Sequence, residues 1–405
     1  MIRNHLWQPV LIGCALAALL SLFIMYPGQA LAAAVRGMAV WWEILFPALF
    51  PFFVISELLF GFGVIHFFGT ILDPLMRPLF KVPGIGGFVM AMGFASGYPV
   101  AARLTAQLRE QRLISRIEAE RLVSFASTSD PIFLIGAVTV GFFGNPQLAG
   151  VLALSHYGGA VAVGLMLRFY GRNQRTVEGP RPHGQPPLIV RAFQAMHEAR
   201  IRDGREFGAV MRDGVQTSIR MIIVVGGLVV FFSVVLELLS LVSLLDSLSF
   251  AVKRLLTLAD LPHSLSEAVV NGFFEVTLGA KAAGHAPGAE LLPKAAVAAF
   301  VLSWSGLSVH AQIVSLLART DVRYAPFLFA RMAHGLISFA IVLAAWRQIP
   351  ANPAVYPVFH LSAAGIRHPG AFFAAGAFVS AVWLCLLLAA LIIASLFFHC
   401  FLRKV

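Results

Sequence analysis

Long apolar runs alternate with short polar segments along the whole chain. A helix needs roughly 20 residues to cross the roughly 30 Å of a bilayer's hydrocarbon core, and eight runs reach about that length. Two further apolar segments, 84–107 and 264–286, carry Gly, Ser and Pro near their middles, and we expect them to turn back as re-entrant hairpins. The pattern predicts an all-α polytopic membrane protein. The expected spans lie near residues 9–27, 39–61, 119–143, 147–169, 217–244, 292–317, 325–346 and 371–399.

The composition supports a protein that lies in a bilayer. Apolar residues make up 59% of the 405 positions and charged residues 12%, about half the share of roughly 25% in soluble proteins. These values exclude a soluble globular protein, a disordered chain and a fibre. Cys14, Cys385 and Cys400 all lie in apolar runs and predict neither a disulfide framework nor a zinc site. No metalloprotease, P-loop or hydrolase motif is present, so the sequence does not predict an enzyme or a resident cofactor.

The placement of charge sets the orientation of the spans. With a cytoplasmic N-terminus and hairpins that do not cross, 22 cations fall inside and 6 outside, as the positive-inside rule requires. Both termini are therefore predicted to be cytoplasmic, and the net charge of +11 reflects cytoplasmic loops, not nucleic-acid binding. The first 34 residues also resemble a signal peptide, with an AxA-like site at Ala30–Ala32. We expect an uncleaved first helix, because a protein with many spans needs no cleavable signal.

The two halves of the chain repeat one pattern. Glu57-Leu58-Leu59 recurs as Glu237-Leu238-Leu239, and GFASGYPVAAR (93–103) corresponds to GFFEVTLGAK (272–281). Each hairpin is followed by a span that small polar residues interrupt, SFASTSDP (124–131) and SWSGLSVHAQ (303–312). The first hairpin would enter from inside and the second from outside, so the repeats are expected to be inverted, as in secondary transporters. The expected parts are scaffold helices and an amphipathic segment in 1–83, a first repeat core in 84–170, a basic loop in 171–216, a second scaffold helix and amphipathic segment in 217–263, a second core in 264–347, and an outer loop and last helix in 348–405.

Several of these motifs are similar to those of one known family. GFASGYPVAAR, SRIEAERLVSFASTSDPIF (115–133) and WSGLSVHAQ (304–312) resemble the YlbJ-type sporulation integral membrane proteins, as do FPFFVISELL and PLMRPLFKVPGIG before the first hairpin. The family belongs to the group with gate, or nucleoside-recognition, domains. The resemblance implies the distant architecture of concentrative nucleoside transporters, with hairpins and broken helices in a mobile domain that moves like an elevator. It also implies a part in endospore formation and in the movement of dipicolinate.

The hairpin tips and the helix breaks supply the candidate binding residues. Backbone that is not helical cannot face lipid, so these segments are expected to meet around a wet cavity near the midplane. An acid within a membrane is costly unless it is paired or hydrated. Glu275 and Asp130 could therefore bind substrate or a coupling ion, or could cap a half-helix. The predicted substrate site comprises Ser96, Gly97, Tyr98, Arg103, Ser127, Thr128, Ser129, Asp130, Asn271, Glu275, Thr277, Lys281, Ser305, Gly306, Ser308, His310 and Gln312.

Other polar residues have two open interpretations. Arg103 and Lys281 could attract an anion, or could extend to the nearest interface. His310 could bind ligand or join two helices, while His156 and His334 are expected to pack. Glu57 and Glu237 are expected to fix the geometry between helices.

The function predicted from these features is secondary-type transport of a small, polar, anionic metabolite, with dipicolinate as the leading candidate. Coupling to H⁺, to Na⁺ or to neither stays open, and the spans outside the repeat cores are expected to form the scaffold and the contacts of a homo-oligomer. The alternatives are a membrane-embedded enzyme that acts on a lipid-linked substrate and a sporulation assembly factor without transport. Substitutions at Ser96 or Ser305 that leave function intact would favour the assembly factor.

Overall fold

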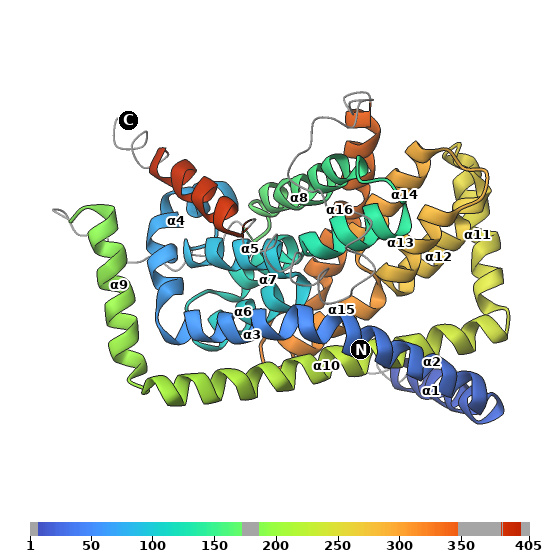
Figure 1. The fold of residues 1–405 in the computed structure, drawn as a ribbon, viewed down its shortest axis with the longest axis horizontal. Coiled ribbons are helices and arrows are strands. Elements are labelled where there is room, and N and C mark those ends of the chain that lie inside the picture. Colours follow the sequence, from blue (N-terminus) through green and yellow to red (C-terminus); the bar gives the residue numbers. More distant parts are fainter. Residues whose placement is uncertain (1–6, 172–185, 347–381, 383, 398–405) are drawn as a thin grey trace.

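A computed structural model describes residues 7–171, 186–346, 382 and 384–397, and every regular element in these ranges is a helix (Figure 1). This confirms the all-helical class for the described part of the chain. Four helices there are long and apolar enough to cross a membrane alone, or up to six if each of two bent pairs forms one span. Of the eight expected spans, the two outside this set are 119–143, which is broken, and 371–399, which lies largely outside the described residues.

The first half of the chain forms a regular order of helices. A capping box starts α7, because Ser115 and Glu118 each accept a hydrogen bond from the other's backbone N–H. The helices are α1 (Trp7–Met25), α2 (Pro27–Val40), a π-helical turn (Trp41–Leu45), α3 (Phe46–Gly61), α4 (Val64–Phe80), α5 (Ile85–Ser96), α6 (Tyr98–Glu110), α7 (Arg116–Ala126), a π-helix (Ile132–Phe142) and α8 (Leu148–Leu167).

The second half begins with a surface helix, α9 (Leu188–Asp203), and then follows a similar order. A further apolar helix covers Leu384–Phe397. The remaining helices are α10 (Phe207–Leu241), α11 (Leu244–Leu258), a short 3₁₀ turn (His263–Leu265), α12 (Ser266–Phe274), α13 (Val276–His285), α14 (Leu291–Trp304), α15 (Gly306–Leu317) and α16 (Tyr324–Ala345). Each segment that was expected to form a hairpin consists of two short helices that pack against each other, α5 with α6 and α12 with α13.

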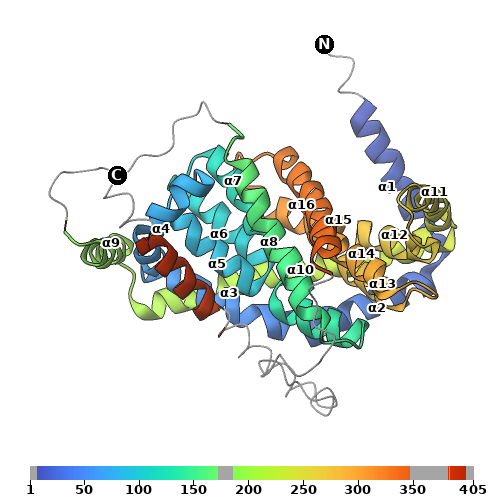
Figure 2. The same ribbon diagram turned by 90° about the horizontal axis from the view of Figure 1, so that it is seen from above.

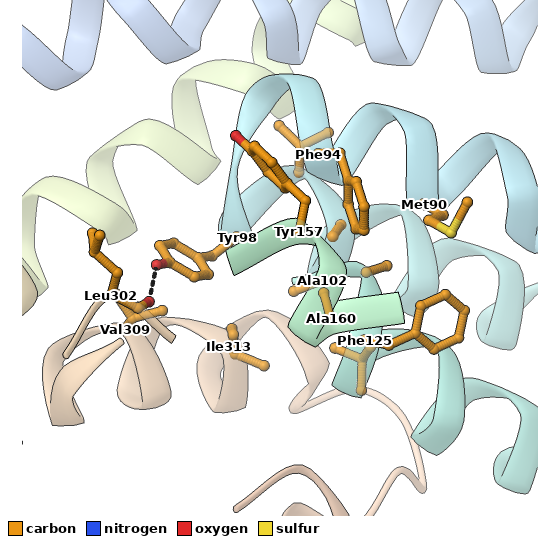
Figure 3. Packing of buried hydrophobic residues seen from close by; sticks show 14 of the residues in the cluster. Met90, Phe94, Tyr98, Ala102, Phe125, Tyr157, Ala160, Leu302, Val309 and Ile313 are labelled. Carbon is orange, nitrogen blue, oxygen red and sulfur yellow. Dashed lines mark hydrogen bonds between the residues drawn. The ribbon is translucent and has the colours of Figure 1, made fainter. Parts of the chain in front are cut away.

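The long helix α10 runs along one side of the molecule and packs against both α3 and α2 (Figures 1 and 2). Of the central helices, α5 and α6 pack against α3 and α15 packs against α10, while α9 lies beside α4 and α11 beside α12 at opposite ends of the molecule. The main apolar core fills the space among α5, α6, α7, α8 and α15, where aromatic and small side chains interlock (Figure 3). The two broken helices therefore meet in the interior.

Candidate functional site

Two helix breaks lie in the centre of this bundle. In the first, α7 ends at Ala126, residues 127–130 are not helical, and Pro131 begins the helical segment that continues as the π-helix at Ile132. The second separates α14 from α15, where Ser305 and Gly306 both have left-handed backbone, at φ 77° and 76°. Such a conformation is costly for a residue other than Gly, so Ser305 marks a sharp reversal. The hydroxyls of both breaks are buried: Ser127, Thr128, Ser129, Ser303 and Ser305.

Each hairpin tip lies against one break. Gly97 separates α5 from α6 at φ 89°, and a Cβ on it would lie 3.5 Å from Asp130 Oδ2. A Cβ on Gly306 would lie 2.9 Å from the carbonyl oxygen of Phe274 and 3.0 Å from the backbone nitrogen of Glu275. The backbone of each tip and its break are thus in near contact, and a side chain on Gly306 would separate them.

Tyr98 connects the first tip to both breaks. Its hydroxyl donates to the carbonyl oxygen of Leu302 at 2.8 Å (Figure 3) and also contacts the hydroxyl of Ser129. Leu302 lies in the last turn of α14, where carbonyl groups have no partner within the helix. One buried phenol therefore satisfies a helix end and joins segments that are 204 residues apart.

Arg331 of α16 spans the two breaks from the other side. It is fully buried, and it donates to the carbonyl oxygens of Ser127 and Ser303 and, at 3.1 Å, to the hydroxyl of Ser305. The guanidinium carbon lies 5.9 Å from the ring centroids of both Tyr98 and Phe327. Its Nε has no hydrogen-bond partner among the residues that the structure describes.

His156 and His334 extend this network. The backbone N–H of Ser129 donates to Nε2 of His156 at 2.9 Å, so the neutral ring carries its proton on Nδ1. Nδ1 then donates to the hydroxyl of Ser303 at 2.8 Å, which donates in turn to Ser338 at 2.8 Å. His334 donates from Nε2 to the carbonyl oxygen of His156 at 2.6 Å, and the two rings stack. The sequence predicts packing for both histidines, but His156 joins the two breaks and His334 holds His156 in place.

The two predicted acids cap half-helices. Asp130 Oδ1 accepts from the backbone N–H of Phe133 at 2.9 Å, and Glu275 Oε2 accepts from Leu278 at 2.8 Å. A carboxylate is favourable at a helix N-terminus for its hydrogen bond and for the helix dipole. Both residues as a whole are half-buried.

The predicted cations lie apart from the breaks. Arg103 pairs with Glu57 of α3 at 3.4 Å, and Gln107 donates to the same carboxylate at 3.1 Å. This pair joins α6 to α3, as expected for a glutamate that fixes the geometry between helices. Glu237 likewise pairs with Arg36 at 2.7 Å. Lys281 is exposed on α13 and has no ion-pair partner in the part of the chain that the structure describes.

The remaining candidates divide by environment. His310 has partners at both ring nitrogens, the carbonyl oxygen of Trp304 at 3.0 Å and the hydroxyl of Tyr324 at 2.7 Å, which is typical of a packed residue. Ser96 is buried at the first tip and its hydroxyl has no partner, and the same holds for Ser127. Asn271 and Thr277 flank Glu275 and are half-buried, whereas Ser308 and Gln312 are buried on α15.

Ion pairs outside the spans hold the loop between α15 and α16. Arg109 at the end of α6 forms two hydrogen bonds with Asp321, of 2.8 and 2.9 Å. The guanidinium of Arg109 lowers the pKa of Asp321 below its ordinary value of 3.8. Arg323 in the same loop donates to the buried carboxylate of Glu120 at 2.8 Å. This loop is thereby fastened to the first hairpin and to α7.

Sequence reasoning missed Arg331 and the histidine pair as parts of the site. The sequence did contain a sign of Arg331, because an ionisable residue within a predicted span usually faces the protein interior and often has a functional role. Among the described residues, no group of three or more His, Cys, Asp and Glu side chains could hold a metal ion. The site therefore consists of helix ends, hydroxyls, two capping acids and one buried arginine.

Comparison with known proteins identifies the family. The family model Gate, described as nucleoside recognition, matches residues 42–146 and 222–320, a segment in each half. The sporulation integral membrane protein YlbJ of Bacillus subtilis (strain 168) is 44% identical over 326 residues, which cover 80% of this chain and 80% of that protein. No solved structure matches this chain. The family resemblance expected from the motifs is confirmed, and the chain belongs to the YlbJ-type integral membrane proteins that carry the Gate domain.

Proposed function

We propose that this protein is a secondary-type transporter of a small polar metabolite, with the site at the two helix breaks. The observation that carries the proposal is the meeting of both breaks and both hairpin tips in the bundle interior. Broken helices at membrane depth require a protein or water environment and are typical of transport sites. Membership of the Gate family supports the same reading.

The repeat is part of this proposal. The order of elements α3 to α8 is similar to that of α10, α11 and α12 to α16, and one family model matches a segment in each half. With both termini cytoplasmic, the hairpins enter from opposite sides and the repeats are inverted. The moving body would comprise 84–169 and 264–346, and it would cross the bilayer like an elevator against a scaffold that includes α3 and α10.

The substrate that we propose is an anion, with an aromatic dicarboxylate such as dipicolinate as the leading candidate. The N-termini of α6 and α15 lie at the first tip and the second break and have no side-chain cap within the described residues, and helix N-termini favour anions. The N-termini of the π-helix and of α13 are already occupied by the carboxylates of Asp130 and Glu275. Arg103 and Lys281 no longer support this choice, because the first pairs with Glu57 and the second is exposed. The anion preference therefore rests on the helix ends.

A neutral nucleoside is the second candidate. Asp130 and Glu275 are half-buried residues, and each caps a helix with one carboxylate oxygen. The other oxygen of each could accept a hydrogen bond from a ribose hydroxyl or a base N–H group, and both carboxylates would repel a dianion. This observation favours a ligand rich in hydrogen-bond donors. Uptake of labelled dipicolinate and of labelled nucleosides into proteoliposomes separates the two candidates. Nucleoside uptake without dicarboxylate uptake would refute the anion assignment.

Glu275→Gln tests the location of the site. Gln keeps the size and an acceptor oxygen, so the tip should fold with a loss of about 1 kcal/mol for the weaker cap, while transport should be abolished. Glu57→Gln is the matched control, because it removes the same charge from a glutamate that pairs with Arg103 on the scaffold side. If Glu275→Gln transports fully and a folded Glu57→Gln does not transport, then Glu57 belongs to the substrate site and Glu275 has only a structural role.

The orientation has its own measurement. A single cysteine placed at residue 405 should react with an impermeant label only after the cells are opened. Labelling in intact cells would contradict a cytoplasmic C-terminus and, with it, the inverted repeats.

A further inference from the structure

Arg331 is buried in an apolar helix without an ion-pair partner. The side chain is fully buried, and none of the ion pairs of the described residues includes it. Its hydrogen-bond partners are neutral oxygens: two backbone carbonyls and one hydroxyl. A buried charge normally needs a counter-charge, because its transfer from water is strongly unfavourable.

The counter-charge comes from two helix ends. Ser127 follows the last residue of α7, and Ser303 is the penultimate residue of α14. The last carbonyl groups of a helix have no partner within it, and each C-terminus carries about half a negative charge. Two such ends supply about −1 in total, which matches the single positive charge of the guanidinium. The cation also satisfies a carbonyl at each end.

In transporters with broken helices, carbonyls and half-helix C-termini at the break are the groups that coordinate Na⁺. Here a side chain of the protein itself contacts those groups. We propose that Arg331 is a resident cation at the two breaks, which takes the place of an exchangeable Na⁺. One consequence rests on the proposed transport function: with Arg331 in this position, transport of the substrate would need no Na⁺.

The chemistry of arginine suits this role. A guanidinium stays protonated in proteins, and its planar fork directs separate N–H groups to separate acceptors, which a lysine ammonium does not match. Arg331 reaches α7 with one terminal nitrogen and α14 with the other. The two breaks are therefore held together by a charge that cannot dissociate, whereas a bound Na⁺ could leave with the substrate.

The first test measures the melting temperature of the full-length protein in detergent, in NaCl and in choline chloride of equal ionic strength. The wild type should melt at the same temperature in both salts. Arg331→Ala should melt at a lower temperature, and millimolar guanidinium should raise it again by refilling the position between the carbonyls. Arg202→Ala is the matched control, since Arg202 is exposed and pairs only with Glu198 in the described part of the chain. It should show neither the loss nor the response to guanidinium.

A saturable rise of the wild-type melting temperature with Na⁺ would overturn the proposal. So would an Arg331→Ala protein that melts like the wild type or ignores guanidinium. If Arg331→Ala does not fold, Arg331→Lys replaces it in the same assay. An Arg331→Lys protein as stable as the wild type would refute the claim that the planar guanidinium is needed to reach both helix ends.

The second test is transport by the wild type in proteoliposomes. Replacing the Na⁺ gradient by a K⁺ gradient should leave the rate unchanged, and a rate that depends on Na⁺ would refute the inference. The melting experiment does not need a known substrate. It therefore decides the role of Arg331 even if the proposed transport function fails.

Discussion

Tyr98→Phe removes one hydroxyl from the point where the first hairpin tip meets both helix breaks. The ring is 7% exposed and would keep its place in the core, so the change in volume is small. The lost group donates to the carbonyl oxygen of Leu302 at 2.8 Å and contacts the hydroxyl of Ser129. Both acceptors are buried or lie at a helix end, and neither can turn to water.

The expected loss of stability follows from these contacts. A buried polar group that loses its partner destabilises a protein by about 1–3 kcal/mol, which corresponds to a decrease of a few degrees in Tm for a chain of this size. The assay is thermal unfolding of the purified protein in detergent, beside Tyr26→Phe. Tyr26 is half-buried at the bend between α1 and α2 and makes no side-chain hydrogen bond within the described residues. The melting temperature of Tyr26→Phe should therefore equal that of the wild type within experimental error.

A double-mutant cycle assigns the effect to the contact. Ser129→Ala alone should also destabilise the protein, and the two changes together should cost less than their sum, with a coupling of about 0.5–3 kcal/mol. Additive effects, or a Tyr98→Phe protein that melts with the wild type, would refute the view that this phenol joins the tip to the breaks.

Two further predictions concern the second hairpin and the loop before α16. Gly279→Ala would place a Cβ 2.2 Å from the Cα of Gly272, and because backbone cannot move aside as a side chain can, we expect a loss of at least about 1–3 kcal/mol in stability. Gly227→Ala, where nothing lies within 4 Å, should be neutral in the same melting assay. The pKa of Asp321 is lowered by Arg109, so this pair stabilises the native state above the ordinary pKa of Asp and the effect is lost as the pH falls through the lowered native value. Asp321→Asn should therefore melt below the wild type at neutral pH and approach it in strong acid, and a difference that does not shrink there would contradict the assignment.

The sequence predicted the breaks and tips well because local chemistry determines them. Pro131 suits the start of a helix and restricts the residue before it, so a break before it is a local preference, and Gly97 and Gly306 permit backbone that other residues rarely adopt. The predicted hairpin segments 84–107 and 264–286 correspond to α5–α6 and α12–α13 within a few residues. These features depend on neighbours in the chain.

The partners within the site could not be predicted, because they come from packing between distant segments. Arg331 binds carbonyl oxygens 204 and 28 residues away, and a backbone carbonyl leaves no mark in the residue sequence. Arg103 and Lys281 end the two similar motifs GFASGYPVAAR and GFFEVTLGAK, yet Arg103 pairs with Glu57 on α3 and Lys281 is exposed. The face that a helix turns to its neighbours decides this difference.

The position of Arg331 in the chain has a consequence for biosynthesis. Ser127 and Ser303 both precede it, so α7 and α14 are made before the ribosome reaches α16. An arginine at the centre of a membrane helix is costly to insert, by about 2.5–3.5 kcal/mol or more, but α16 packs directly on both α14 and α7 and meets acceptors that already exist. Until then the ends of α7 and α14 have no cation between them. The centre of the nascent chain therefore remains incomplete until α16 is inserted, and a product that stops earlier would leave the carbonyl groups of Ser127 and Ser303 without the guanidinium that binds them.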